Sequence, residues 1–265
     1  SGPDSAHIIG YYLKKKYGMP WVADFRDEWI NNPYLNFDLK TQLDKLYQYL
    51  EKNIVLKADH VICVAKPIID HYANTYSINQ SKIHSITNGY DEYDFIDLDY
   101  KSTKNSKFRI IYSGILSTAR RSIEPILESV ERMINNGYIN KEEIEIYIVG
   151  SEKDKHEEML KQYFFPEHVF FTGYCSHKTA LQYTVDSELL ILLIGDDDKY
   201  SAIYSGKIFD YLRSGVPILA FAPYGGVVDI LLRETGHGFS VLSTEKNKID
   251  EIILNKYEKW RIKSD

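Results

Sequence analysis

The chain has 265 residues, and its 44% of hydrophobic and 26% of charged residues are ordinary for a globular protein with a sizeable core. A net charge of −6 argues against a general electrostatic grip on nucleic acid, and no apolar run approaches the roughly 20 residues of a membrane span. No signal peptide is recognisable, and the two cysteines, Cys63 and Cys175, lie outside any CxxC pattern. We therefore expect reduced thiols and a cytoplasmic location.

The first part of the chain alternates helical periodicity with short apolar runs. Three helices are expected: one that ends near Gly18, one over residues 38–56 and one over residues 67–76. Three strands are expected, at residues 21–25, 61–65 and 82–87. Three strands are few for a stable sheet, so this part of the chain should expose apolar surface or pair with another chain.

The polar run DLDYKSTKNSK, residues 97–107, lacks periodicity and is the best candidate for a linker. We expect one domain over residues 1–98, a linker over 99–107 and a second domain over 108–265. Six strands are expected in the second domain, at residues 109–114, 145–150, 169–173, 188–195, 217–222 and 239–242. Helical patterns fill most of the gaps, which indicates βαβ units and a doubly wound sheet. Ligands of such sheets bind beyond the carboxyl ends of the strands.

One helix of the second domain begins with small residues, in the stretch SGKIFDYLRSG. Ser205 and Gly206 would let a phosphate approach the free N–H groups of the helix start. Lys207 could neutralise that phosphate, and Asp210, one turn later on the same face, could accept two hydroxyl hydrogens from a ribose. The alternative, weighed evenly, is a surface Lys207–Asp210 pair.

The first strand of the second domain ends at Gly114 and leads through a loop to Arg120 and Arg121. A glycine lets a ligand approach the backbone closely, and arginine suits phosphate oxygens. Two solvated arginines are the alternative. Because this loop and the helix at Lys207 both follow strands of one sheet, the two signals support each other.

Five stretches of the chain, in this order, resemble glycosyltransferase family 4, a family of retaining enzymes with the GT-B architecture. They are SGPDSAH, PWVADFRDEW, ITNGYDEYDF, YSGILSTARR and KIFDYLRSGVPILAF. The resemblance covers nearly the whole chain. It implies two Rossmann-like, doubly wound domains of parallel sheet, of which the N-terminal one is incomplete because relatives usually carry about a hundred further residues before SGPDS.

The resemblance assigns roles in binding a nucleotide-activated sugar to residues of the second domain. Arg120 matches a basic residue that binds the donor diphosphate, and Gly114 matches the glycine under the phosphates. Asp210 matches a glutamate that binds the ribose hydroxyls, and Lys207 matches a lysine of one branch of the family. Tyr174 follows a strand where contacts to the base are usual.

Two departures from the family pattern matter. Ile115 stands where many members have a basic residue, so phosphate neutralisation would rest on Arg120, Arg121 and Lys207. Ala202 stands where the family often has the first of two glutamates, which puts the contact to the donor sugar in doubt. The acidic run at residues 196–198 is interpreted as a solvated loop and not as a metal site.

On the N-terminal side, Asp24, Arg26 and Asp27 follow a strand. The resemblance suggests a role for them near the acceptor or the hinge, and a buried Arg26 salt bridge is the alternative. Asp27 and His7 are the candidate catalytic residues, although a surface or structural histidine is the favoured interpretation of His7. No catalytic base is assigned.

The implied reaction transfers a sugar from a UDP- or GDP-sugar to a hydroxyl acceptor with retention of the anomeric configuration. No metal or other cofactor is expected, because cationic side chains and backbone amides would stabilise the diphosphate leaving group. Family habit suggests a saccharide or lipid-linked acceptor in bacterial surface polysaccharide synthesis, with peripheral association at the inner face of the membrane. No nucleic-acid partner is expected.

Two other functions stay open at this point. A nucleotide-sugar 2-epimerase of the same architecture would use the same nucleotide site without an acceptor. A non-catalytic nucleotide-binding or scaffold protein would account for the missing carboxylate at Ala202 and for the shortened N-terminal domain.

Overall fold

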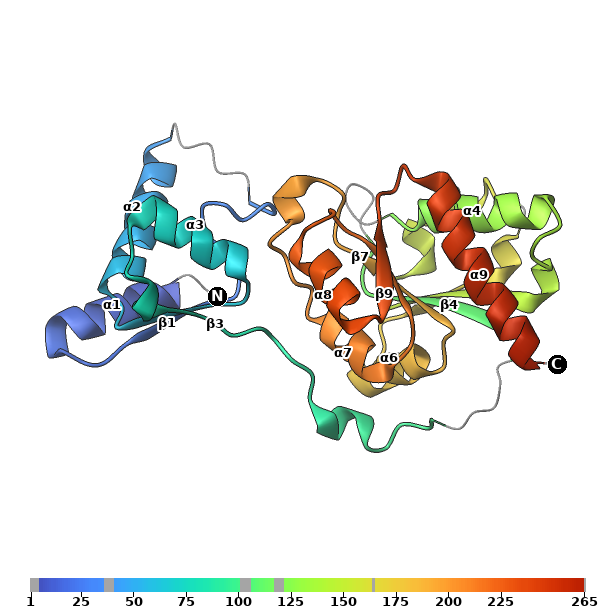
Figure 1. Cartoon of the computed structure of the whole chain (residues 1–265), viewed down its shortest axis with the longest axis horizontal. Helices are drawn as coiled ribbons and strands as arrows, with labels where there is room; N and C mark the ends of the chain where they lie inside the picture. The colour runs from blue at the N-terminus through green and yellow to red at the C-terminus, as the bar shows by residue number, and fades with distance from the viewer. Residues whose placement is uncertain (1–4, 36–40, 101–105, 117–121, 164, 265) are drawn as a thin grey trace. The chain divides into compact units, whose positions relative to one another are not determined.

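A computed structural model describes residues 5–35, 41–100, 106–116, 122–163 and 165–264. The chain divides into two compact units (Figure 1). The first unit contains Ser1–Asn88 with Ala202–Tyr204, and the second contains Gly89–Ser201 with Ser205–Asp265. Each unit is described by itself.

The first unit is a parallel sheet of three strands in the order β1-β2-β3. Its elements are α1 (Ser5–Tyr17), β1 (Val22–Phe25), α2 (Gln42–Lys57), β2 (His60–Cys63), α3 (Lys66–Tyr76) and β3 (Ile83–Ser85). The two crossovers run in the same direction across the sheet, so the right-handed rule places α2 and α3 on one face. The side chains of Phe25, Val55 and Tyr72 are fully buried in this unit.

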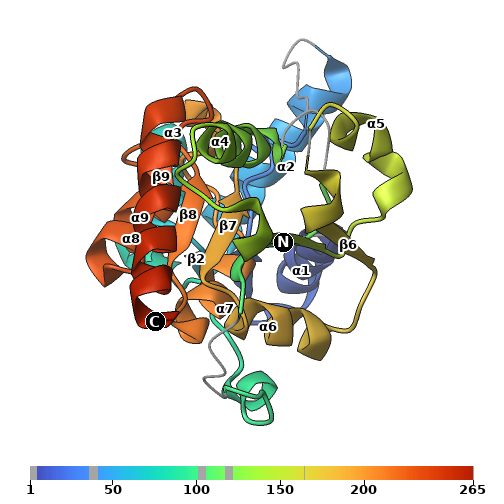
Figure 2. The same ribbon diagram turned by 90° about the vertical axis from the view of Figure 1, so that its right-hand side faces the viewer.

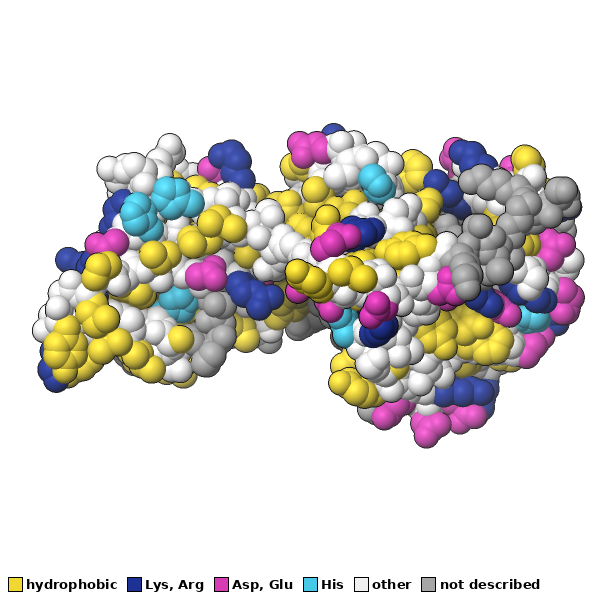
Figure 3. All heavy atoms as spheres, turned by 90° about the horizontal axis from the view of Figure 1, so that it is seen from below, with side chains coloured by type: hydrophobic (Ala, Val, Ile, Leu, Met, Phe, Trp, Pro, Cys, Tyr) yellow, Lys and Arg dark blue, Asp and Glu magenta, His cyan; other side chains and the backbone are white. Residues whose placement is uncertain are grey.

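Much apolar surface of the first unit stays exposed, as the small number of strands predicted. Ile9, Tyr12 and Tyr17 of α1 are 57% to 62% exposed, and Val22 of β1 is 53% exposed. In the space-filling view of Figure 3, hydrophobic side chains spread over this unit. The first unit is therefore a small sheet with an incompletely covered surface.

The second unit is a parallel sheet of six strands in the order β6-β5-β4-β7-β8-β9. Its strands are β4 (Phe108–Ser113), β5 (Ile144–Val149), β6 (Val169–Gly173), β7 (Leu189–Leu193), β8 (Ile218–Phe221) and β9 (Gly238–Val241). Its α-helices are α4 (Glu124–Asn135), α5 (Glu157–Leu160), α6 (His177–Val185), α7 (Lys207–Ser214), α8 (Val227–Thr235) and α9 (Lys246–Ser264).

The strand order of the second sheet reverses between β4 and β7. Helices α4 and α9 pack together on one face, whereas α6, α7 and α8 lie on the other (Figures 1 and 2). Every residue of β7 is buried, as the apolar run at this strand predicted. A reversal of strand order opens a crevice at the carboxyl ends of the two strands beside it, so ligands of such sheets bind there.

The expected fold class is confirmed: both sheets are parallel α/β sheets, and the N-terminal one is the smaller. All nine expected strands are present, with ends that shift by one or two residues at most sites. Both cysteines are free thiols, as expected. Of the helix expected over 38–56, residues 38–40 lie outside the described part, and α2 begins at Gln42.

The division between the units falls ten residues before the boundary expected at residue 98. Residues 89–98 belong to the second unit, because Phe95 is buried beside Leu181 of α6. The Arg213 guanidinium also donates to Glu92 at 2.7 Å and lies 5.0 Å from the centre of the Phe95 ring. Of the expected linker over 99–107, residues 101–105 lie outside the described part.

Candidate functional site

The loop after β4 is held at the point where the strand order reverses. Gly114 donates its N–H to the carbonyl oxygen of Val149 at 2.7 Å. The buried Ser151 hydroxyl donates to the Gly114 carbonyl oxygen at 3.0 Å and accepts the Leu116 N–H at 2.8 Å. The backbone at Gly114 is therefore fixed from two directions by the end of β5.

Lys207 lies directly against Gly114. A Cβ atom at Gly114 would collide with the Lys207 ammonium and would lie 3.0 Å from the Tyr112 hydroxyl, so a glycine is needed for this approach. The backbone of Gly114 also has a φ of +145°, which side-chain-bearing residues rarely adopt. The structure thus brings together Gly114 and Lys207, two predicted site residues from different βα units.

Helix α7 positions Lys207 through its buried face. Ile208, Phe209 and Tyr211 are buried, and the Tyr211 hydroxyl accepts the N–H of Ser113 at 3.0 Å. This bond connects α7 to the last residue of β4, next to Gly114. Ser205 and Gly206 precede the helix as expected, and a Cβ atom at Gly206 would meet open space.

Asp210 lies one turn beyond Lys207, and it faces a histidine that the sequence analysis missed. The Nε2 atom of His177 lies 3.6 Å from Oδ2 of Asp210, and its Nδ1 atom lies 3.5 Å from Oδ2 of Asp94. Burial raises the pKa of the Asp210 carboxyl, and the charge of His177 opposes this rise. No sequence motif near His177 indicated a role for it, because its partners come from distant parts of the sequence.

The predicted site also includes an aromatic ring after β6 and two arginines after β4. Tyr174 follows β6 and is 94% exposed, so its ring is open to a ligand. Arg120 and Arg121 lie outside the described residues.

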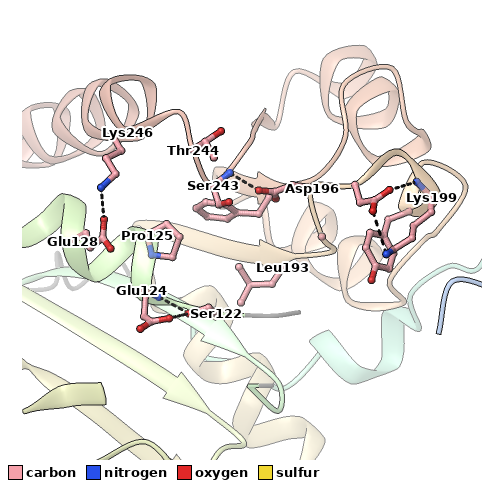
Figure 4. A pocket seen from close by; sticks show the side chains of 14 residues that line it. Ser122, Glu124, Pro125, Glu128, Leu193, Asp196, Lys199, Ser243, Thr244 and Lys246 are labelled. Atoms are coloured by element: carbon pink, nitrogen blue, oxygen red, sulfur yellow. Dashed lines mark hydrogen bonds and ion pairs between the residues drawn. The ribbon is translucent and has the colours of Figure 1, made fainter. Parts of the chain in front are cut away.

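A pocket of about 610 Å³ lies at the carboxyl ends of β7, β8 and β9 (Figure 4). It is lined by Ser122, Glu124, Pro125, Glu128, Leu193, Gly195, Asp196, Asp197, Lys199, Tyr200, Phe221, Ser243, Thr244 and Lys246. Among the described residues, none of the predicted site residues lines it. Its acidic side chains have partners within the chain: Glu128 pairs with Lys246 at 3.0 Å, and Asp197 pairs with Lys199 at 3.1 Å.

The acidic run at residues 196–198 is largely exposed, as interpreted from the sequence, and two of its carboxylates also accept hydrogen bonds from the backbone. Asp196 accepts the N–H of Ser243 at 2.6 Å, and Asp197 accepts the N–H of Lys199 at 3.0 Å. These carboxylates fix the loop after β7. Within the part of the chain that the structure describes, no group of three or more His, Cys, Asp and Glu side chains is arranged to hold a metal ion.

The N-terminal candidates differ in burial. His7 is buried and stacks on Phe25 with ring centres 4.5 Å apart, and burial lowers the pKa of its imidazole to about 4. Asp27 is exposed, and so is Arg26, which rules out the buried salt bridge considered for it. His7 thus has the surroundings of a packed core residue.

Part of the chain is similar to a known protein family. Residues 2–93 match the family model Glycosyltransferase Family 4, and no curated protein matches the chain. Among the described residues, none of the helices combines the length and the apolar character needed to cross a bilayer.

Several solved structures share the fold of the chain. WaaG, a glycosyltransferase involved in lipopolysaccharide biosynthesis, is 11% identical with a TM-score of 0.65, and the match covers 94% of this chain and 71% of WaaG. Anabaena HepE, solved in complex with UDP, is 16% identical with a TM-score of 0.69, and the match covers 96% of this chain and 67% of HepE.

Sucrose-phosphate synthase from Thermosynechococcus elongatus is 17% identical with a TM-score of 0.64, and the match covers 98% of this chain and 62% of that protein. The chain therefore spans between 62% and 71% of the length of these three proteins. At these identities the likeness concerns the fold. Residues 2–93 thus match the model of Glycosyltransferase Family 4, and the chain has the GT-B fold that its sequence motifs indicated.

Proposed function

We propose that the chain is a glycosyltransferase whose second unit binds a nucleotide sugar at the carboxyl ends of β4 and β7. The observation that carries this proposal is the contact of the Lys207 ammonium with the bare backbone of Gly114, at the reversal of strand order. A cation above an unobstructed backbone is suited to a diphosphate. The match of residues 2–93 to a glycosyltransferase family supports the same reading.

The groups around this contact suit the rest of a nucleotide. Asp210 lies one helical turn from Lys207 and carries a half-buried carboxylate that could accept hydroxyl hydrogens of a ribose. The exposed ring of Tyr174 is available to stack on a base. UDP is present in the solved structure of HepE, which makes UDP the first nucleotide to test.

In the proposed reaction, the bond between the sugar C1 and the diphosphate oxygen breaks, an acceptor hydroxyl forms a new bond to C1 with retention, and the hydroxyl proton passes to the departing diphosphate. Negative charge develops on the departing diphosphate. Lys207, together with backbone N–H groups at the start of α7, would stabilise this charge without a metal ion. We propose a saccharide or lipid-linked acceptor of a surface polysaccharide, because WaaG, which shares this fold, is involved in lipopolysaccharide biosynthesis.

Isothermal titration calorimetry with UDP, GDP and ADP tests the nucleotide site. We expect at least one to bind, and Lys207→Gln to weaken it about tenfold or more, because a charge-assisted bond to phosphate contributes roughly 1.5–3 kcal/mol. Lys141→Gln is the matched control, since Lys141 pairs with Glu167 in the same unit. A folded protein that binds none of the three nucleotides would contradict the proposal.

Product analysis then tests the reaction. Incubation of a UDP- or GDP-sugar with saccharide acceptors should give a new glycoside with the anomeric configuration of the donor, which NMR coupling constants report. Epimerisation of the donor in the absence of any acceptor would favour a nucleotide-sugar 2-epimerase instead.

A further inference from the structure

His177 stands between two carboxylates that come from different elements of the second unit. It is the first residue of α6, and its Nε2 atom lies 3.6 Å from Oδ2 of Asp210 in α7. Its Nδ1 atom lies 3.5 Å from Oδ2 of Asp94, in the 3-10 helix Glu92–Phe95. Each ring nitrogen therefore faces one carboxylate oxygen.

The other cationic side chains near His177 and Asp210 contact different groups. Arg213, one turn after Asp210, donates to Glu92 at 2.7 Å, and Lys178, the residue after His177, donates to Asp97 at 3.1 Å. Lys207, one turn before Asp210, lies against Gly114. Among the ion pairs of the described residues, the positive partner of Asp210 is His177.

The contact with His177 affects how Asp210 can form hydrogen bonds to a ligand. A carboxylate is an acceptor with two oxygens, whereas a protonated carboxyl also donates a hydrogen bond. Burial disfavours the charged form of Asp210, the charge of Asp94 adds to that effect, and the charge of His177 opposes both. With Oδ2 turned toward His177, the other oxygen of Asp210 is left for a hydroxyl hydrogen.

We propose that His177, oriented by Asp94, is a positioning residue of the nucleotide site that holds Asp210 turned to accept a hydroxyl of the ribose. This inference rests on the proposed function. It adds a specificity determinant for the ribose that the sequence motifs do not contain, and it makes nucleotide affinity depend on the charge of a histidine. Since histidine changes its charge between about pH 5 and 8, the dependence falls in an accessible range.

The test compares His177→Gln with the wild type and with Lys178→Gln, the neighbouring exposed control. Titrations use UDP, GDP and ADP and their 2′-deoxy forms at pH 5.5 and pH 8. At pH 5.5 we expect His177→Gln to weaken binding of the ribonucleotide about two- to fivefold, as the loss of one partly exposed ion pair predicts. The loss should be smaller at pH 8 and smaller for the 2′-deoxy form, and Lys178→Gln should behave as the wild type.

The titrations can contradict the role of His177 without contradicting the proposed nucleotide site. Nucleotide binding by the wild type that is insensitive to His177→Gln at pH 5.5 would overturn the role of His177 alone. Absence of binding of all three nucleotides to the wild type would overturn the proposed site and, with it, this role.

Discussion

The two units of the chain are both parallel α/β structures, yet different interactions hold their interiors together. The second unit surrounds a six-stranded sheet with helices on both faces, and its core is a continuous apolar cluster that includes Phe108, Ile126 and Tyr257. The described residues of the first unit form a sheet of three strands, and large apolar side chains of α1 are exposed. Apolar burial thus explains the interior of the second unit better than that of the first.

A buried carboxylate takes a central place in the first unit. Glu51 of α2 is 1% exposed and accepts hydrogen bonds from the N–H groups of Trp29 and Ile30, at 2.9 and 3.2 Å. It also accepts the hydroxyl groups of Tyr72 at 3.2 Å and Tyr76 at 2.6 Å. One side chain therefore connects the loop after β1 to two turns of α3. A small sheet can thus be fixed by a polar hub, here the Glu51 carboxylate, where little apolar area is buried.

The largest effect should follow from removing this hub. Glu51→Ala leaves four donors without their acceptor, and each unsatisfied buried group costs about 1–3 kcal/mol, so we expect the first unit to lose about 3 kcal/mol or more. Urea unfolding followed by the fluorescence of Trp21 and Trp29 reports on this unit when Trp260 is replaced by Phe.

The control for this prediction is Asp70→Ala, which removes an exposed pair with Lys66. It should change the free energy of unfolding by about 0.5 kcal/mol or less. Equal stability of the Glu51→Ala variant and the control would mean that Glu51 does not hold the unit together, and the contrast between the two interiors would fail.

A smaller effect should come from Glu28, whose Oε1 atom is buried without a hydrogen-bond partner among the described residues. Burial, and then the nearby charge of Glu51, raise the pKa of the Glu28 carboxyl from 4.5 to about 7. The folded protein therefore binds a proton that the unfolded chain has already released between about pH 4.5 and 7. By linkage, the stability of the first unit contributed by Glu28 falls as the pH rises through this range and is level above it.

Glu28→Gln should remove this fall and should stabilise the first unit at pH 8 by up to about 3 kcal/mol, since one pKa unit corresponds to about 1.4 kcal/mol. His7, whose pKa is lowered to about 4, acts in the opposite direction between pH 4 and 6.5, but it is present in both proteins. The difference between their urea midpoints at pH 5 and pH 8 reports on Glu28 together with its contact to His71, whose Nε2 atom lies 4.0 Å from Oε1 of Glu28. A difference that does not change with pH would contradict the prediction.

The sequence predicted the parts of this structure that depend on neighbours in the chain. Buried parallel strands leave runs such as residues 189–194, in which every position is apolar, so the strands and the fold class followed from the pattern. The placement of Gly114 and Lys207 at one edge of the sheet also followed, because strand ends and helix starts of a doubly wound sheet meet there, whereas their contact is a finding of the structure.

The parts that the sequence did not predict depend on distant residues. Glu51 lies in an ordinary amphipathic helix, and nothing in that helix tells that Tyr72 and Tyr76 point to it. The proposed role of His177 likewise depends on Asp94 and Asp210, which lie close to it only in the folded chain. Polar pairing across elements leaves no periodic signal, whereas apolar burial does.

The smallest change in stability, and the sharpest test of the site, should come from two glycines of the second unit. Gly114 and Gly137 both have positive φ angles, +145° and +75°, so alanine at either should cost a similar strain of about 1–3 kcal/mol. They differ in surroundings: a Cβ atom at Gly137 meets open space, whereas one at Gly114 meets the Lys207 ammonium. Because the lysine side chain can move aside, the collision should displace the cation and add little to the loss of stability.

Gly114→Ala and Gly137→Ala should therefore unfold at similar urea concentrations but differ in nucleotide affinity. We expect Gly114→Ala to weaken binding of UDP, GDP or ADP by more than tenfold, since it removes both the open backbone and the position of Lys207. Gly137→Ala should bind as the wild type does. Equal affinities of the two variants would show that the phosphates do not bind at the backbone of Gly114. The nucleotide site of the second unit would then lie at the end of another strand of its sheet.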